Sequence, residues 1–237
     1  MKRAIGAVAL CLTMAVGACG DDNGTSQGTT ATTTAISTIV AAPTTTKAPQ
    51  RGGILTIGQF GAPPGLDPTK LPGGGCCGGT EHMAIYDALM RYNPDTLKYE
   101  PRTAESLTPN ADYSVWTLKI RPNIKFTDGN PYDANAVKYV HDRELAEGNA
   151  APKGQFQSSV AKVEVVDNLT VRYTLSKPWT GFPFVLASIN GIIYSPAAQQ
   201  KAGANFNTAP SDAGAGPFKV KSYKPGEALD LERNPNY

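Results

Sequence analysis

The stretch Trp116–Val140, WTLKIRPNIKFTDGNPYDANAVKYV, restricts the fold of this chain more than any other part of the sequence. Trp116, Leu118 and Ile120 alternate with polar residues, and a period of two residues predicts a half-buried β-strand. Pro122 interrupts the strand, because proline has no N–H group to donate to a neighbouring strand.

A turn and a helix are expected after this strand. Residues 124–126 form a second short extended piece, and Thr-Asp-Gly-Asn at 127–130 closes it, because glycine tolerates positive φ in turns. Asp133 has the short polar side chain that caps a helix, which we predict to run from Ala134 to about Gly148. The predicted inner face of this helix consists of Ala136, Val137, Val140 and Leu145.

The amino terminus has the pattern of an export signal. A basic start, Met1–Arg3, precedes the apolar run Ala4–Val16, which is too short to span a bilayer. Val-Gly-Ala-Cys at 16–19 resembles a bacterial lipobox, so we expect residues 1–18 to be a signal peptide and Cys19 to carry a lipid. The alternative is an ordinary secretory signal that happens to contain a cysteine. Cys11 lies within the apolar run and is expected to be removed with it.

Residues 19–50 are rich in Thr, Ala, Ser and Pro and contain almost no large apolar side chains. Such a segment cannot bury enough surface to offset the entropy of ordering it, so we predict a flexible spacer between the membrane and a domain that begins near Arg51. Removal of the signal peptide leaves twenty basic and twenty acidic residues. Without a basic stripe interleaved with aromatic residues, nothing in the sequence favours a nucleic-acid partner.

The remaining chain, from Arg51 onward, is long enough for one domain or two small ones. Its patterns predict short strands and helices, and two β-hairpins are indicated by alternating runs on either side of turn residues. The expected elements are a strand over 54–58, a helix over 81–91, a hairpin from 160–166 and 170–175, a short helix from Pro178 over an aromatic cluster, a strand over 189–194, a helix capped by Ser195, and strands on both sides of Pro225-Gly226.

Several short motifs occur along this region, and their order along the chain is the same as in a known protein family. The central stretch has Arg121-Pro122, Lys125-Phe126 and Asp128-Gly129-Asn130-Pro131, and a second group closes the chain as LERNPNY at 231–237. Other matching motifs are Gly52-Gly53-Ile54-Leu55, Leu66-Asp67-Pro68, Tyr86-Asp87-Ala88-Leu89 and Gly214-Ala215-Gly216-Pro217-Phe218. With these motifs the chain resembles the family 5 extracellular solute-binding proteins, the oligopeptide, dipeptide and nickel-binding receptors of ABC importers.

The resemblance implies a mixed α/β fold of the type II periplasmic-binding-protein kind. By this comparison, residues 51–82 and 178–237 belong to the first lobe, and 83–177 form the extra subdomain of the family. The second lobe is missing, because members of the family continue for about as many residues again. We therefore expect the N-terminal part of a longer protein or a truncated product. A ligand site that lacks one wall is expected to bind weakly.

The resemblance also implies a function. It indicates a lipid-anchored receptor on the outer face of the cell membrane that captures a peptide or another small solute and delivers it to ABC permease subunits. No cofactor and no covalent chemistry are expected, so we do not predict an enzyme. The alternative function is a non-transport surface lipoprotein that acts as an interaction or sensing module.

Candidate ligand contacts come from two loops. By position, the resemblance places Gly73, Gly74, Gly75, Cys76 and Cys77 where the family's backbone lines the ligand cleft, and glycines let main-chain groups approach a peptide. A merely mobile loop is the alternative. Gly214, Gly216 and Phe218 form a second candidate at the edge of the cleft, and the alternative role of these glycines is to form a turn.

Cys76 and Cys77 are adjacent, which is unusual. In an exported protein they are candidates for a strained disulfide, for an intermolecular disulfide or for free thiols. A soft-metal site with His82 is disfavoured, since the spacing is not that of zinc sites. We expect His141 to lie at the surface or at the edge of the core. No hydrolase elbow, Walker loop or zincin motif is present, and thiol catalysis lacks an adjacent cation to activate Cys76 or Cys77.

Overall fold

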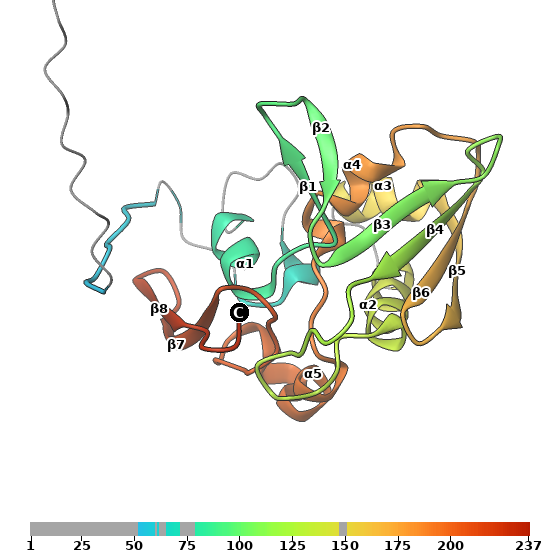
Figure 1. Cartoon of the computed structure of the whole chain (residues 1–237). Helices are drawn as coiled ribbons and strands as arrows, with labels where there is room; N and C mark the ends of the chain where they lie inside the picture. Colours follow the sequence, from blue (N-terminus) through green and yellow to red (C-terminus); the bar gives the residue numbers. More distant parts are fainter. Residues whose placement is uncertain (1–51, 60, 62–64, 72–78, 147–150) are drawn as a thin grey trace, which may run out of the picture. The chain divides into compact units, whose positions relative to one another are not determined.

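A computed structural model describes residues 52–59, 61, 65–71, 79–146 and 151–237, and its strands form three antiparallel sheets (Figure 1). The largest has the strand order β3-β4-β6-β5, and the other two are the hairpins β1-β2 and β7-β8. The strands are β1 Met90–Asn93, β2 Lys98–Pro101, β3 Ala104–Pro109, β4 Val115–Ile120, β5 Val160–Asp167, β6 Thr170–Leu175, β7 Phe218–Lys224 and β8 Ala228–Arg233.

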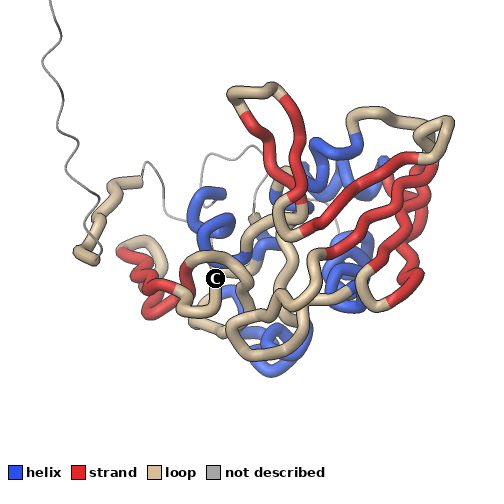
Figure 2. The backbone as a smooth tube through the Cα atoms, viewed as in Figure 1, coloured by secondary structure: helices blue, strands red, loops and turns tan. Residues whose placement is uncertain are grey.

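Helices cover the sheet and connect the hairpins. Figure 2 shows α2 and α3 behind the four-stranded sheet, and α2 packs mainly on β5 and β6. The α-helices are α1 Gly79–Tyr86, α2 Ala134–Ala146, α3 Ala151–Ser159, α4 Phe182–Leu186 and α5 Pro196–Ala202. The 3₁₀-helices are η1 Pro68–Lys70, η2 Ile189–Gly191 and η3 Gly203–Asn207. Residues Leu55–Tyr237 form one compact unit.

The predicted central strand is confirmed as β4, which lies inside the largest sheet and pairs with β3 and β6. Its alternation is the one the sequence predicted, because Trp116, Leu118 and Ile120 are buried while Lys119 is exposed. The apolar face of β4 belongs to a core that also contains Val137 of α2. The hydrophobic effect therefore joins sheet and helix at this point.

Local sequence signals of turns and caps are confirmed. The hairpin β5-β6 turns at Asp167–Thr170, and β7-β8 turns between Lys224 and Ala228. The Asp133 carboxylate accepts a hydrogen bond of 2.9 Å from the Ala136 N–H at the start of α2. Ser195 caps α5 in the same way, with 3.2 Å between its Oγ and the Ala198 nitrogen. These side chains satisfy N–H groups that have no partner within the helix.

The helix expected over 81–91 is shorter than predicted and ends at Tyr86. The reason is Asp87, whose φ of 63° lies in the left-handed region that commonly ends helices. Its carboxylate accepts a hydrogen bond of 2.7 Å from the Ala88 N–H and forms an ion pair with Arg102. The chain then enters β1, so Met90 packs from a strand and not from a helix.

Two predicted strands are wrong for the described residues. Residues 54–58 form no strand, and the side chain of Ile54 is 97% exposed, because no described strand donates or accepts hydrogen bonds there. Residues 189–191 form η2 instead of a strand, because the Ser188 side chain accepts from the Asn190 N–H and starts a 3₁₀ turn. Next to η2, Ile192 forms an isolated antiparallel bridge with Ala88.

The prediction for His141 is also wrong, since this residue is fully buried. Its ring takes part in a chain of aromatic contacts that runs from Trp116 through Phe182, Tyr173 and His141 to Phe156, with ring centroids 4.7–5.9 Å apart. Its Nε2–H donates to the Asn190 carbonyl at 2.9 Å, and its Nδ1 accepts from the Tyr173 hydroxyl at 3.1 Å. Burial lowers the pKa of His141 to about 4.

This burial predicts a pH-dependent stability. In the unfolded chain the pKa of histidine is about 6.5, so between pH 6.5 and 4 the unfolded state binds more protons and stability rises with pH. We expect His141 to contribute about 2 kcal/mol to the fall in unfolding free energy between pH 7.5 and 5. Urea unfolding of the wild type and His141→Gln at several pH values measures this contribution. Parallel pH profiles of the two proteins would contradict the prediction.

Candidate functional site

A loop anchored by Asp67 leads into the segment that the sequence assigns to ligand contact. Asp67 caps η1, because its Oδ1 accepts from the Thr69 N–H at 2.9 Å and from the Thr69 hydroxyl at 2.7 Å. The loop is also held from the opposite side, where the Leu66 N–H donates to the Asn207 carbonyl at 2.9 Å. Gly65 is required there, since a Cβ atom would lie 2.0 Å from the Asn207 side chain.

Arg143 of α2 forms a buried ion pair with Asp67. Its Nη2 lies 2.7 Å from Asp67 Oδ2, and its Nη1 donates to Oδ1 at 3.2 Å and to the Tyr194 hydroxyl at 2.8 Å. The Asp67 side chain is 3% exposed and that of Arg143 is 17% exposed. Burial lowers the pKa of Arg143, but its hydrogen bonds to Asp67 and Tyr194 outweigh this effect, so the pKa stays above its ordinary value. The guanidinium is therefore permanently charged.

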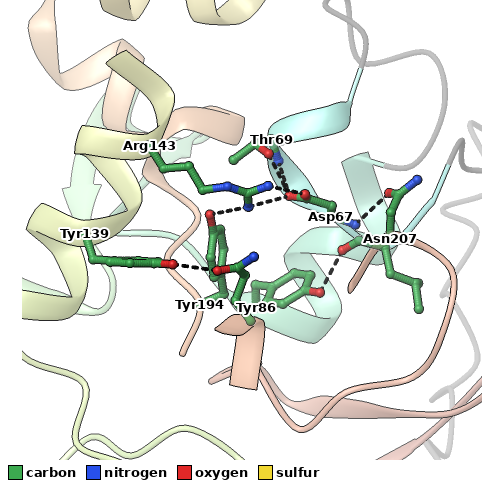
Figure 3. A network of polar contacts seen from close by, with 9 residues as sticks. Asp67, Thr69, Tyr86, Tyr139, Arg143, Tyr194 and Asn207 are labelled. Carbon is green, nitrogen blue, oxygen red and sulfur yellow. Dashed lines mark hydrogen bonds and ion pairs between the residues drawn. The ribbon is translucent and has the colours of Figure 1, made fainter. Parts of the chain in front are cut away.

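Tyrosine hydroxyls extend this polar network, as Figure 3 shows. The Tyr86 hydroxyl of α1 donates to the Leu66 carbonyl at 2.7 Å, and the Tyr139 hydroxyl of α2 donates to Gln199 Oε1 of α5 at 2.5 Å. The rings of Tyr86 and Tyr194 meet edge to face at 6.3 Å. The network thus ties η1, α1, α2 and α5 to one another.

The first group of predicted ligand residues, Gly73 to Cys77, lies outside the described residues. Its flanking elements are described, and both belong to the Arg143 network: η1 through Asp67 on one side and α1 through Tyr86 on the other. The fold therefore positions the two ends of this segment through buried hydrogen bonds. Cys19, the predicted lipid site, also lies outside the described part of the chain.

The second group of predicted ligand residues consists of two buried glycines and one exposed phenylalanine, all within the described part of the chain. Gly214 and Gly216 are buried against the end of α1, where a Cβ atom would lie 2.1 Å and 2.5 Å from the carbonyl oxygens of Ile85 and Ala84. The Gly216 N–H donates to the Ile85 carbonyl at 2.9 Å. Phe218, at the start of β7, is 41% exposed. Both glycines thus allow close packing, and Phe218 is the one member of this group whose side chain faces outward.

Helix α1 follows the first group in the sequence and packs against the second. The segment up to residue 78 joins the helix at Gly79, whereas Gly214 and Gly216 contact its last residues. A helix rises 1.5 Å per residue, so these contacts are about 8 Å apart along the helix axis. Helix α1 therefore supports the loop of Gly214 and Gly216 directly.

Two hollows open on the surface near these elements. One of about 500 Å³ lies between the turn at Asp128 and α5, where Lys201 and Asp212 form part of its wall. The other, of about 260 Å³, is lined by Asp87, Arg102 and residues of the closing motif. There, Tyr237 donates its hydroxyl to Asp87 Oδ2 at 3.0 Å, and burial raises the pKa of Asp87 against the lowering effect of Arg102 and Tyr237.

The described residues contain no group of three His, Cys, Asp or Glu side chains that could hold a metal ion. His82 is buried and stacks on Tyr86 at 5.8 Å. Asp128 acts as a turn residue, because it accepts from the Asn130 N–H at 2.9 Å and from the Ser195 hydroxyl. Within the described ranges, no helix has the length and apolar character needed to cross a membrane. His82 and Asp128 thus have structural contacts in the described part of the chain.

Comparison with known proteins identifies the family. Residues 98–237 match the family described as bacterial extracellular solute-binding proteins, family 5 Middle, and this match covers more than half of the chain. The chain belongs to the family 5 solute-binding proteins. The recognised resemblance and the mixed α/β fold of the periplasmic-binding-protein kind are thereby confirmed.

Individual members of family 5 support the same assignment. The probable D,D-dipeptide-binding periplasmic protein DdpA of Escherichia coli K12 is 33% identical over 191 residues, which cover 78% of this chain and 36% of the relative. The glutathione-binding protein GsiB of the same strain is 31% identical over 154 residues, with 65% and 30% covered. The chain thus spans about a third of the length of these curated relatives.

A solved structure extends the comparison to three dimensions. The binding protein AgaA from A. tumefaciens R10, in complex with agropinic acid, superposes with a TM-score of 0.65 and is 33% identical. The superposition covers 75% of this chain and 35% of AgaA. These homologues are solute-binding receptors and not enzymes, in agreement with the absence of catalytic motifs from the sequence.

Arg143 was not among the residues predicted from the sequence, although the sequence contains a signal for it. Arg143 follows Ala136 and Val140 along the same face of α2, where a helical period predicts apolar side chains. A charged residue in such a row requires a buried partner. That partner, Asp67, lies 76 residues away, so the sequence could show the need for a partner but not which residue supplies it.

The Arg143 network predicts a large loss of stability on substitution. Arg143→Met leaves the buried Asp67 carboxylate without its cation and should lower the unfolding free energy by about 3 kcal/mol. Adding Asp67→Asn removes the stranded charge and should restore part of this loss. The matched control is Lys138→Met on the same helix, whose exposed ion pair with Asp142 should contribute less than about 0.5 kcal/mol. Urea denaturation measures the unfolding free energy of Arg143→Met, of the double variant and of Lys138→Met. A double variant no more stable than Arg143→Met would contradict the role of the buried pair.

Proposed function

We propose that this protein is the solute-binding component of an ABC importer and that its ligands are peptides. The observation that carries the proposal is the family 5 match over residues 98–237. The relative DdpA is a probable D,D-dipeptide-binding protein, which supports peptides as the ligand class. In this role the protein captures its ligand reversibly and passes it to ABC permease subunits, without covalent chemistry.

The proposed ligand contacts are the glycine-rich segment 73–77 and the outward-facing Phe218. Support comes from the buried network, because Asp67 and Tyr86 hold the elements on both sides of this segment. A site with fixed supports loses less conformational entropy when it binds. Phe218 adds an exposed ring that can pack against an apolar ligand side chain.

We also propose that the protein is held on the outer face of the cell membrane by lipid on Cys19. Support comes from the sequence alone: a basic start, a short apolar run and small residues directly before the cysteine. The division into first lobe and extra subdomain, at about residues 83 and 177, is likewise proposed from the resemblance.

The transport role predicts a defect in peptide uptake. Deleting the gene in the source bacterium should lower uptake of radiolabelled tri-alanine, and the wild-type gene should restore it. The Phe218→Ala gene should restore it several-fold less well, because an apolar contact with the ligand is lost. Val166→Ala is the control, since Val166 is 47% exposed, Phe218 is 41% exposed, and Val166 belongs to neither predicted ligand loop. Unchanged uptake in the deletion strain would favour the alternative of a non-transport surface lipoprotein.

Lipidation predicts a cysteine-specific label. Growth with radiolabelled palmitate should label the wild-type protein, and Cys19→Ala should abolish the label and release the protein from the membrane fraction. Cys11→Ala is the control and should leave both unchanged, because this cysteine precedes the cleavage site. Equal labelling of the wild type and Cys19→Ala would exclude the proposed anchor.

A further inference from the structure

The β1-β2 hairpin presents a group of exposed apolar side chains. Tyr92 is 49% exposed, Tyr99 is 37% exposed, and Leu97 at the turn is 73% exposed. Phe184 of α4 adds a fourth, at 44%. The rings of Tyr92 and Tyr99 lie 5.4 Å apart, and Tyr99 meets Phe184 at 6.3 Å. The three rings thus form one group, and Leu97 lies at the turn of the same hairpin. These four residues are here called the hairpin patch, and the hairpin stands out from the sheet in Figure 1.

The turn that carries Leu97 is well formed. The Asn93 side chain accepts from the Asp95 N–H at 2.9 Å and donates to Glu100 Oε1 at 2.7 Å, which closes the turn across its base. Leu97 itself has a φ of 55°, a left-handed conformation that is uncommon for large side chains and that glycine or asparagine adopts more easily. The fold thus places a leucine in a strained position where its side chain points to solvent. Strain of this kind is concentrated at functional positions.

The charges around the patch compensate one another. Arg91 forms an ion pair with Glu100 at 2.8 Å, and the turn has one further acid and one further base, Asp95 and Lys98. A partner recognised by charge would gain little here. The combination of leucine, phenylalanine and two tyrosines is instead suited to an interface between apolar chains and water, where tyrosine rings lie at the level of lipid headgroups.

The length of the proposed spacer indicates that the membrane is the partner of the hairpin patch. With the composition of the proposed spacer, the roughly 30 residues between Cys19 and Arg51 would have a root-mean-square reach of roughly 30 Å. A domain held that close to a bilayer has a high effective concentration at its surface, so even a weak apolar contact is populated. One lipid group alone gives marginal membrane binding, and a second contact strengthens it.

We propose that the hairpin patch docks on the lipid surface of the membrane, with Leu97 inserted at the headgroup boundary. The proposal rests on the lipid anchor of the proposed function, and it adds a second membrane contact that sets the orientation of the domain. The contact is apolar and does not require anionic lipid.

Sedimentation with vesicles tests the contact without the anchor. The chain from residue 20 onward retains every described residue, and it should sediment to the same extent with vesicles of phosphatidylcholine alone and with vesicles that contain phosphatidylglycerol. Leu97→Ser should lower the bound fraction at least five-fold. Val166→Ser is the matched control, since Val166 is 47% exposed on the edge strand β5, and it should change binding less than two-fold.

A second readout reports insertion directly. In Leu97→Trp the added fluorescence, after subtraction of the wild-type signal, should shift to shorter wavelength with vesicles and be quenched by brominated lipids. Three results would overturn the proposal: equal sedimentation of Leu97→Ser and the wild type, binding only to anionic vesicles, or loss of binding in Ile54→Ser/Leu55→Ser but not in Leu97→Ser. If Leu97→Ser leaves vesicle binding intact but lowers peptide uptake, the patch contacts the permease instead. The vesicle results do not depend on whether the proposed ligand or anchor is correct.

Discussion

The ion pair between Arg143 and Asp67 connects parts of the chain that no short-range interaction brings together. Two charges removed from water are costly to bury, so such a pair persists only where further hydrogen bonds satisfy both groups. Thr69 and Tyr194 supply these bonds. The position of η1 relative to α2 therefore depends on a small number of well-directed contacts, and with it the position at which the glycine-rich segment begins.

Helix α1 has a comparable role on the other side of that segment. The hydroxyl of Tyr86 donates to the carbonyl of Leu66, in the loop before η1. Gly214 and Gly216 pack so closely on the last carbonyl groups of α1 that a side chain at either position would clash. The family motif Gly-x-Gly-Pro-Phe thus has a packing explanation in this chain. The same motif ends in an exposed ring, Phe218, so one short sequence serves both the core and the surface.

Prediction from the sequence succeeded where the determining contacts are local. The alternation in β4, the hairpins β5-β6 and β7-β8 and the caps of Asp133 and Ser195 depend on residues a few positions apart. Prediction failed for two kinds of reason: Ser188 starts a 3₁₀ turn locally where a strand was expected, and elsewhere a residue distant in sequence contributes. The apolar pattern over 81–91 indicated one helix, but the ion pair of Asp87 with Arg102 accompanies a left-handed turn that ends it. The candidate glycines 214 and 216 were found, yet their packing against α1 was not.

The amino-acid sequence by itself determined the family, the order of most elements and the faces that strands and helices bury, because periodicity and turn residues act over short distances. Only the tertiary structure decided that His141 is buried among aromatic rings, that Arg143 neutralises Asp67 and that residues 54–58 have no described strand partner. These outcomes depend on which residues meet across long stretches of chain. A buried charge or an unpaired strand edge costs free energy unless a partner is present, and only the tertiary structure shows which residue that partner is.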